Sequence, residues 1–297
     1  MKADLKGKAI YKPKGKAGEY AEWACNFYVG CSNGCEYCYL KKGRGAKILG
    51  GDKPTLKKCF KDESDAIGVF KKELDQNLSE LQKCGLFFSF TTDPMLPETK
   101  ILTNYACSLA VEQNIPVKIL TKRSDWVDDF IYWIENSNSD NAQREWRKMY
   151  AYGFTLTGRD ELEPNTNTNA ERIEVMRKLH DAGFKTFASI EPVIDFESSL
   201  QMLWAIRDHC DMAKVGLESG RKYNKSELRD FMTKAIFWAN GDRMCYESLR
   251  FKGFKIYFKD GLLKQAGVNR EDLPGNCVSR DYNIFQLWKQ KQKKQDK

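Results

Sequence analysis

Short apolar runs alternate with helix-forming segments along most of this 297-residue chain, and this alternation constrains the fold more than any other feature. Seven runs have the length and composition of β-strands, and they cover residues 23–29, 86–91, 117–121, 152–157, 185–190, 212–217 and 254–258. Strands that alternate with helices are typical of a parallel α/β sheet or barrel. No linker, low-complexity segment or internal repeat interrupts the pattern, so we expect one main α/β domain.

Helical segments fill the intervals between these runs. Ser124 and Asn169 are predicted to cap two helices, because their side chains can accept a hydrogen bond from a backbone N–H of the first turn. The helix after Asn169 is predicted to end at Gly183, since glycine readily adopts the left-handed conformation of a helix end. Another helix is predicted to begin at Ser226 and to end near Gly241. A further apolar helical face repeats every three or four residues through Ile67, Phe70, Leu74, Leu78 and Leu81.

Basic residues concentrate at the two ends of the chain, which carries a formal net charge of +8. We expect a basic N-terminal arm over residues 1–20, the main domain over 21–262, and a C-terminal extension with a basic tail over 263–297. Such ends can bind a polyanion such as DNA or RNA, or can simply keep the protein soluble. The polar segment 136–147 is predicted to be a surface insertion.

Cysteine content and hydropathy indicate the compartment. The N-terminal sequence MKADLKGKAI is no apolar signal segment, and no apolar run is long enough to span a membrane. Ten cysteines without a secretory signal are expected to be free thiols in a reducing compartment. We therefore expect a cytoplasmic protein without a membrane partner.

Polar residues follow several of the predicted strands. In parallel α/β architectures, ligands bind at the carboxyl ends of the strands. Helix caps and turns favour the same residue types, so each position taken singly is also consistent with a purely structural role. The candidate ligand-binding residues at these ends are Thr91, Thr92, Asp93, Lys122, Thr155, Thr157 and Glu191.

Three cysteines in the segment VGCSNGCEYCYL, Cys31, Cys35 and Cys38, have the spacing Cys-x3-Cys-x2-Cys. Three thiolates on one short loop can bind three irons of a [4Fe–4S] cluster, whereas proteins that only carry electrons normally supply four. The open fourth iron predicts a small-molecule ligand and hence catalysis. A zinc site or a non-catalytic cluster is the alternative. Zinc requires a fourth ligand, and only two histidines, His180 and His209, exist far along the chain.

This spacing, with Tyr37 before the last cysteine, resembles the radical S-adenosylmethionine (radical SAM) superfamily. The resemblance implies an open, partial (β/α)6 TIM-like barrel of the radical SAM type. It also implies a [4Fe–4S] cluster that cleaves S-adenosyl-L-methionine to a 5′-deoxyadenosyl radical. Between about Tyr28 and Asp195, the chain resembles the spore photoproduct lyase-like (DNA repair photolyase-related) branch. That likeness lies in the segments GCSNGCEYCYL, FTTDPMLPET, ILTKRS, GFTLTGRDELEPNT and IEPVID.

The resemblance implies roles position by position. The three motif cysteines would bind the cluster. The backbone of Tyr37 would contact the adenine, and Tyr39 would line the pocket. Thr92 would contact the amino group of SAM and Lys122 its carboxylate. Thr155 would reach the ribose or the carboxylate.

The chain departs from the lyase-like pattern at two positions. The lyase has a hydrogen-donating cysteine where this chain has Phe90, and a phenyl ring cannot donate such a hydrogen atom. Another cysteine, Cys84 or Cys277, or a tyrosine could take that part. Glu191 replaces a small apolar residue, so its predicted role rests on the wider superfamily. The resemblance assigns no role to Glu163.

Two classes of substrate therefore stay open. The lyase-like branch and the basic ends favour DNA or RNA, whereas the missing cysteine favours a peptide or a small molecule. Either reaction implies a one-electron reductant such as flavodoxin or ferredoxin.

Overall fold

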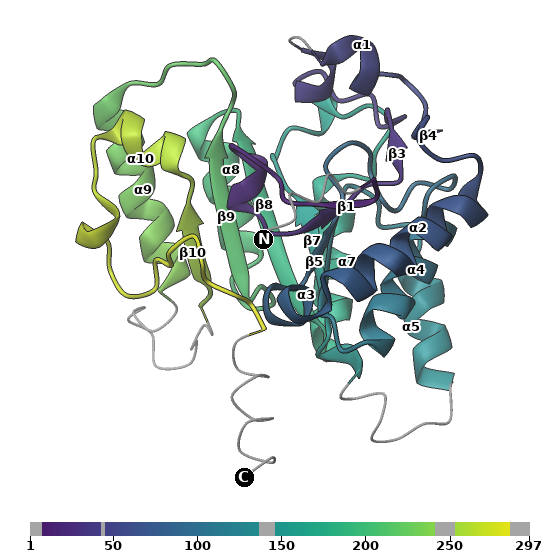
Figure 1. Cartoon of the computed structure of the whole chain (residues 1–297). Coiled ribbons are helices and arrows are strands. Elements are labelled where there is room, and N and C mark those ends of the chain that lie inside the picture. Colours follow the sequence, from purple (N-terminus) through teal and green to yellow (C-terminus); the bar gives the residue numbers. More distant parts are fainter. Residues whose placement is uncertain (1–7, 43–44, 137–145, 241–252, 286–297) are drawn as a thin grey trace.

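The computed structural model describes residues 8–42, 45–136, 146–240 and 253–285. Its central feature is an eight-stranded sheet in the order β1-β2-β5-β6-β7-β8-β9-β10 (Figure 1). Neighbouring strands from β2 to β10 are parallel, and β1 pairs antiparallel with β2. The strands of this sheet are β1 Ile10–Tyr11, β2 Ala24–Cys25, β5 Leu86–Phe88, β6 Val117–Thr121, β7 Tyr150–Thr155, β8 Lys185–Val193, β9 Met212–Leu217 and β10 Lys255–Phe258.

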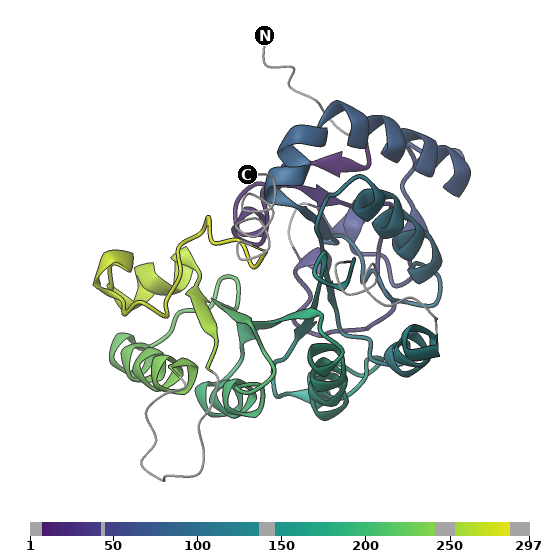
Figure 2. The same cartoon turned by 90° about the horizontal axis from the view of Figure 1, so that it is seen from below.

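The helices lie in an arc along the outer face of the sheet (Figure 2). They are α2 Glu63–Gln76, α3 Leu78–Cys84, α4 Lys100–Glu112, α5 Val127–Asn136, α7 Asn169–Asp181, α8 Phe196–Ala205, α9 Lys225–Ala239 and α10 Asp260–Ala266. The short helix α1 Ala46–Leu49 lies apart from them, next to residues 39–41 (Figure 1). Four 3-10 turns are described: η1 Ala17–Glu19, η2 Tyr39–Lys41, η3 Asp160–Leu162 and η4 Arg270–Asp272. No described helix has the length and apolar character needed to cross a membrane.

The core has two parts, one on each face of the sheet. The larger part fills the space between the strands and the outer helices. The smaller part covers the inner face, where Tyr20 and Tyr257 pack with Val278, Ile284 and Phe285 from the C-terminal region. Both ends of the described chain therefore cover the inner face of the sheet. The loops that follow the carboxyl ends of the strands carry the residues described below.

The expected α/β fold with a mostly parallel sheet is confirmed. The first predicted strand, 23–29, is wrong as one element. Its first half is β2, while β3 (Tyr28–Val29) leaves the sheet and pairs antiparallel with β4 (Thr55–Leu56). The cysteine loop follows β3, so the loop begins outside the main sheet.

One predicted helix cap and one predicted helix start are corrected. Thr168 caps α7, because it forms a capping box with Glu171, and Asn169 is the first helical residue. Asn224 caps α9, since its side chain accepts from the N–H groups of Ser226 and Glu227. Gly183 has a φ of 91°, as predicted for a residue after a helix end.

The apolar face predicted over residues 67–81 belongs to two helices. They divide at Asn77, whose side-chain amide donates to the carbonyl of Glu73 at 2.8 Å. α5 begins at Val127, whose N–H donates to the carbonyl of Ser124. Gly241 and most of segment 136–147 lie outside the described residues.

Candidate functional site

The cysteine loop is held in a tight path by two glycines. Gly30 has a φ of 82°, and a Cβ atom there would lie 2.4 Å from the carbonyl oxygen of Lys53. Gly34 has a φ of 72°, and its Cβ would lie 2.9 Å from Nδ2 of Asn165. Only glycine combines this conformation with such close approach. The loop therefore packs against two separate backbone segments at once.

The thiols of Cys31, Cys35 and Cys38 line one small cavity together with Asn33, Gly34, Leu40, Lys41, Leu49, Gly50 and Gly51. Burial raises the pKa of the Cys31 thiol to about 12, and the charge of Asp93 adds to this shift. Burial also raises the pKa of Cys35, although the ammonium of Lys122 opposes the shift. Within the described residues, no three His, Cys, Asp or Glu side chains are grouped so as to hold a metal ion.

Asp93 joins the cysteine loop to the end of β6. One carboxylate oxygen accepts from Nδ2 of Asn33 and from the N–H of Lys122, both at 2.8 Å. The other oxygen accepts from the hydroxyl of Thr121 at 2.6 Å and from the N–H of Met95 at 3.0 Å. Each oxygen thus has two protein donors. This geometry makes Asp93 a structural link between the two segments, and its part in binding a cofactor stays a prediction.

Two buried polar atoms beside this link have no hydrogen-bond partner among the described residues: the hydroxyl of Thr92 and Oδ1 of Asn33. The two residues are 8% and 3% exposed. Buried polar atoms are normally hydrogen-bonded, so such a pair fits the polar groups of a bound ligand. Asn33 lines the cysteine cavity, and the sequence analysis had not singled it out.

Lys122 follows β6, and its Nζ lies 5.5 Å from the centre of the Tyr37 ring. Burial lowers the pKa of Lys122, but the neighbouring Cys35 and Glu163 raise it, and the net shift is upward. The structure thus brings this predicted site residue beside the cysteine loop as a charged ammonium.

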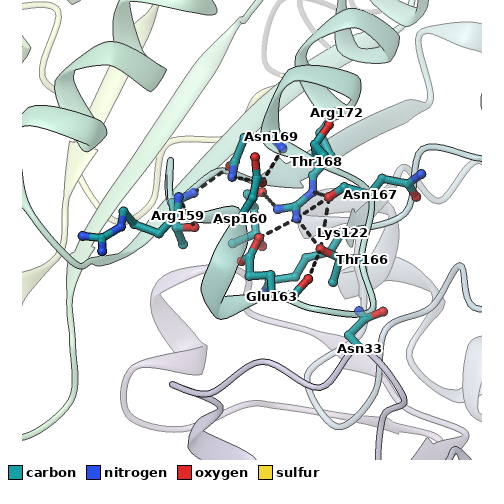
Figure 3. Close-up of polar contacts among 12 residues, drawn as sticks. Asn33, Lys122, Arg159, Asp160, Glu163, Thr166, Asn167, Thr168, Asn169 and Arg172 are labelled. Atoms are coloured by element: carbon teal, nitrogen blue, oxygen red, sulfur yellow. Dashed lines mark hydrogen bonds and ion pairs between the residues drawn. The ribbon is translucent and has the colours of Figure 1, made fainter.

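Glu163 is the residue of this region that the sequence left without a role. It accepts a hydrogen bond from the hydroxyl of Tyr37. Its second oxygen lies 2.5 Å from Nη2 of Arg172 in α7, and Figure 3 shows this pair. The side chains of Glu163 and Arg172 are both fully buried. Sequence reasoning could not find this pairing, because Tyr37 and Glu163 are far apart in the chain.

The hydroxyls of two predicted site residues are used within the fold. The hydroxyl of Thr91 donates to the carbonyl of Tyr28 at 2.6 Å, and that of Thr157 accepts from the N–H of Arg159 at 3.3 Å. Thr155 lies buried at the end of β7 and accepts at its carbonyl from Arg172.

Tyr39 is the most exposed of the predicted site residues. Tyr39 is the first residue of η2, directly after Cys38, and it is 58% exposed. Its hydroxyl donates to the carbonyl of Phe90.

Glu191 belongs to a second polar cluster, at the carboxyl ends of β8 and β10. Its carboxylate accepts from Nζ of Lys259 at 2.8 and 3.0 Å and from the hydroxyl of Tyr20 at 2.7 Å. Gly216 lies between the two charged side chains, where a Cβ would be 2.7 Å from atoms of both. Sequence reasoning pointed to Glu191 and Lys259 at strand ends, but it found neither their pairing nor the contact with Tyr20.

Comparison with known proteins relates this fold to one solved protein. Neither the family models nor the curated proteins gave a match. The chain is similar to Streptococcus suis SuiB bound to the precursor peptide SuiA, with a TM-score of 0.51 and 12% identity over 85% of this chain and 52% of that one. SuiB bound to S-adenosylmethionine gives a TM-score of 0.49 and 11% identity over 82% of this chain and 51% of that one. The chain spans about half the length of SuiB, and the likeness concerns the fold alone.

Proposed function

We propose that this chain is a radical SAM enzyme that acts on a peptide. Cys31, Cys35 and Cys38 would bind a [4Fe–4S] cluster. When bound, that cluster supplies the electron that splits S-adenosylmethionine and so produces a radical able to take hydrogen from the substrate. The observation that carries the proposal is one cavity lined by all three motif cysteines and by Asn33, whose buried Oδ1 has no hydrogen-bond partner among the described residues.

The donor set supports a cluster better than a zinc ion. A single zinc needs ligands about 2.3 Å from one point, so its sulfur atoms must converge. Cluster ligands bind different irons and lie further apart. Three cysteines that line one cavity are consistent with the second arrangement.

The residues around the cavity support a site for the amino acid part of SAM. The hydroxyl of Thr92 and Oδ1 of Asn33 can both accept from an ammonium group, and both lack a protein partner among the described residues. Lys122 provides a half-buried cation that would bind a carboxylate. Tyr39, exposed beside Cys38, would line the entrance. Thr155 and the paired carboxylate of Glu191 would lie on the substrate side.

A peptide is the better substrate proposal than nucleic acid. SuiB, which shares this fold, is solved with a precursor peptide. The comparisons give no support to the spore photoproduct lyase-like branch, and Phe90 lacks the thiol of the lyase. The sequential order of parallel strands fits an open (β/α)6 barrel over residues 21–262, which we include in the proposal. A flavodoxin or ferredoxin would provide the electron.

Anaerobic reconstitution with iron and sulfide, followed by reduction in the presence of SAM, tests the chemistry. We expect about four irons per chain and 5′-deoxyadenosine by chromatography. Cys35→Ala should abolish both, whereas Cys59→Ala, which changes an exposed cysteine outside the motif, should abolish neither. Zinc in place of iron, or a cluster that never cleaves SAM, would overturn the proposal. Salt-sensitive binding to DNA would instead favour the nucleic-acid substrate.

A further inference from the structure

We infer that Tyr37, Glu163 and Arg172 form a brace that positions the cysteine loop against the end of β7. Tyr37 lies between Cys35 and Cys38, so a fixed tyrosine side chain also fixes the backbone that carries these two thiols. The brace acts through the loop, and all three are positioning residues. The meaning of the brace for a cluster rests on the proposed function, whereas its effect on the loop does not.

Arg172 is the rigid base of the brace. It is fully buried, and its guanidinium donates to Glu163 at 2.5 Å, to the carbonyl of Thr155 at 2.7 Å and to the carbonyl of Asn167 at 2.8 Å (Figure 3). The hydroxyl of Thr166 also accepts from it, at 2.6 Å. These partners belong to the end of β7 and to the loop before α7. The planar guanidinium, with donors in a fixed fork, thereby holds Glu163 in one orientation.

Glu163 connects this base to the cysteine loop. One of its oxygens binds Arg172, and the other accepts from the hydroxyl of Tyr37. A hydrogen bond to a charged acceptor is directional and about twice as strong as a neutral one. The bond therefore restrains the orientation of the Tyr37 side chain. Apolar packing alone would restrain this orientation less.

Backbone contacts between the same two segments support the brace. The N–H of Glu36 donates to the carbonyl of Leu162 at 3.0 Å. The N–H of Asn165 donates to the carbonyl of Asn33 at 3.3 Å, and its side-chain amide donates to the carbonyl of Ser32 at 3.1 Å. The loop is thus hydrogen-bonded to residues 162–165 along most of its length, and the brace adds a buried, charged contact to these bonds.

A buried ion pair is poorly explained by stability alone. Removing two charges from water costs free energy that their attraction often does not recover, and apolar residues of similar volume frequently stabilise as well or better. The charged pair also orients a neighbouring hydroxyl through a hydrogen bond, and apolar residues cannot form that bond. This is the reason to assign the pair a positioning role.

Tyr37→Phe tests the brace in the protein without iron, because it removes one hydroxyl and leaves the Glu163–Arg172 pair intact. We expect amide hydrogen exchange over residues 31–38 and alkylation of Cys35, followed by mass spectrometry, to become about tenfold faster. Tyr132→Phe, at an exposed tyrosine of α5, is the matched control and should change neither rate. Equal rates in Tyr37→Phe and the wild type would overturn the brace.

Reconstituted protein provides the second readout. In Tyr37→Phe, the reduced cluster should have an altered electron paramagnetic resonance spectrum and should lose iron to a chelator faster. Glu163→Asp should change the spectrum and the rate of iron loss less than Glu163→Ala does, because it retains a carboxylate for Arg172. A wild type that binds no iron, with a loop that loosens in Tyr37→Phe, would support the brace and contradict the proposed function. A loaded wild type whose spectrum and iron loss match those of Tyr37→Phe would contradict the brace alone.

Discussion

Two buried clusters of this protein combine the same three chemical groups, a tyrosine, a glutamate and a cation, but arrange them for different purposes. In the brace, Glu163 is fully buried and lies between Tyr37 and Arg172. In the inner cluster, Glu191 lies between Tyr20 and Lys259, and 18% of its side chain is exposed. The first joins two loops beside the cysteine cavity, and the second joins an N-terminal turn to the ends of β8 and β10.

The choice of cation explains much of this difference. Arg172 donates to several fixed backbone carbonyls as well as to its carboxylate, so it defines a direction. Lys259 places a compact charge near two carboxylates, 2.8 Å from Glu191 and 3.7 Å from Glu19. An arginine fork transmits geometry, whereas a lysine ammonium mainly neutralises charge. We therefore expect the brace to control the loop, and the inner cluster to control how firmly the N-terminal turn is held.

The largest expected effect is on the inner cluster. Lys259→Met leaves the carboxylate of Glu191 buried without its cation, and should lower the free energy of unfolding by about 3–5 kcal/mol in urea titrations. Lys264→Met, at an exposed lysine of α10, the helix that follows Lys259, should change this free energy little. Iron binding per folded chain should be unaffected. A stable Lys259→Met protein that fails to load iron would reverse the roles assigned to the two clusters.

Gly216→Ala should separate the inner ion pair by steric contact. The added Cβ would lie 2.7 Å from Cδ of Glu191 and from Cδ of Lys259. We expect a loss of about 1–3 kcal/mol in the free energy of unfolding. Gly261→Ala is the matched control with the opposite sign. Its Cβ would meet no atom within 4 Å, and a helical alanine should stabilise α10 by roughly 0.5–1 kcal/mol. A Gly216→Ala protein as stable as the wild type would show that the pair tolerates separation.

Lys214, whose ammonium donates to the carbonyl of Tyr20 at 3.2 Å beside the inner cluster, should also titrate. Burial, followed by the charges of Lys118 and Lys259, holds the pKa of Lys214 well below its usual value. Between that lowered pKa and about 10.4, the unfolded chain binds more protons than the folded one. Stability should therefore rise with pH in this range, by at most about 1.4 kcal/mol per unit. Unfolding at pH 7, 8 and 9 should reveal a slope that is smaller in Lys214→Met, and identical slopes would contradict this assignment.

The smallest effect is expected at an exposed ion pair on the helix that carries Arg172. Nζ of Lys178 lies 2.6 Å from Asp128 of α5, but 35% and 72% of the two side chains are exposed. Solvent screens such a pair, so Lys178→Ala should change the free energy of unfolding by about 0–1 kcal/mol. Thermal and urea unfolding measure this change. A loss as large as that of Lys259→Met would mean that burial does not separate the two classes of ion pair.

The sequence by itself determined the elements with strong local signals. The alternation of apolar runs and amphipathic segments predicted an α/β fold with a mostly parallel sheet, because the side-chain periods of strands and helices are local properties. The cysteine spacing likewise singled out three residues whose thiols line one cavity. Local signals also placed Gly183 after a helix end, since this prediction depends only on the backbone conformation of that residue.

Only the tertiary structure decided which distant groups meet. β3 is separate from the main sheet because it pairs with β4, a strand that follows the cysteine loop in the sequence. The four protein donors of Asp93 come from separate segments that only the fold brings together. Glu163 and Arg172 acquired a role only when the fold placed Tyr37 against them. Hydrogen bonds and ion pairs act over a few ångströms, so sequence spacing carries no record of them when the partners lie on different strands and loops.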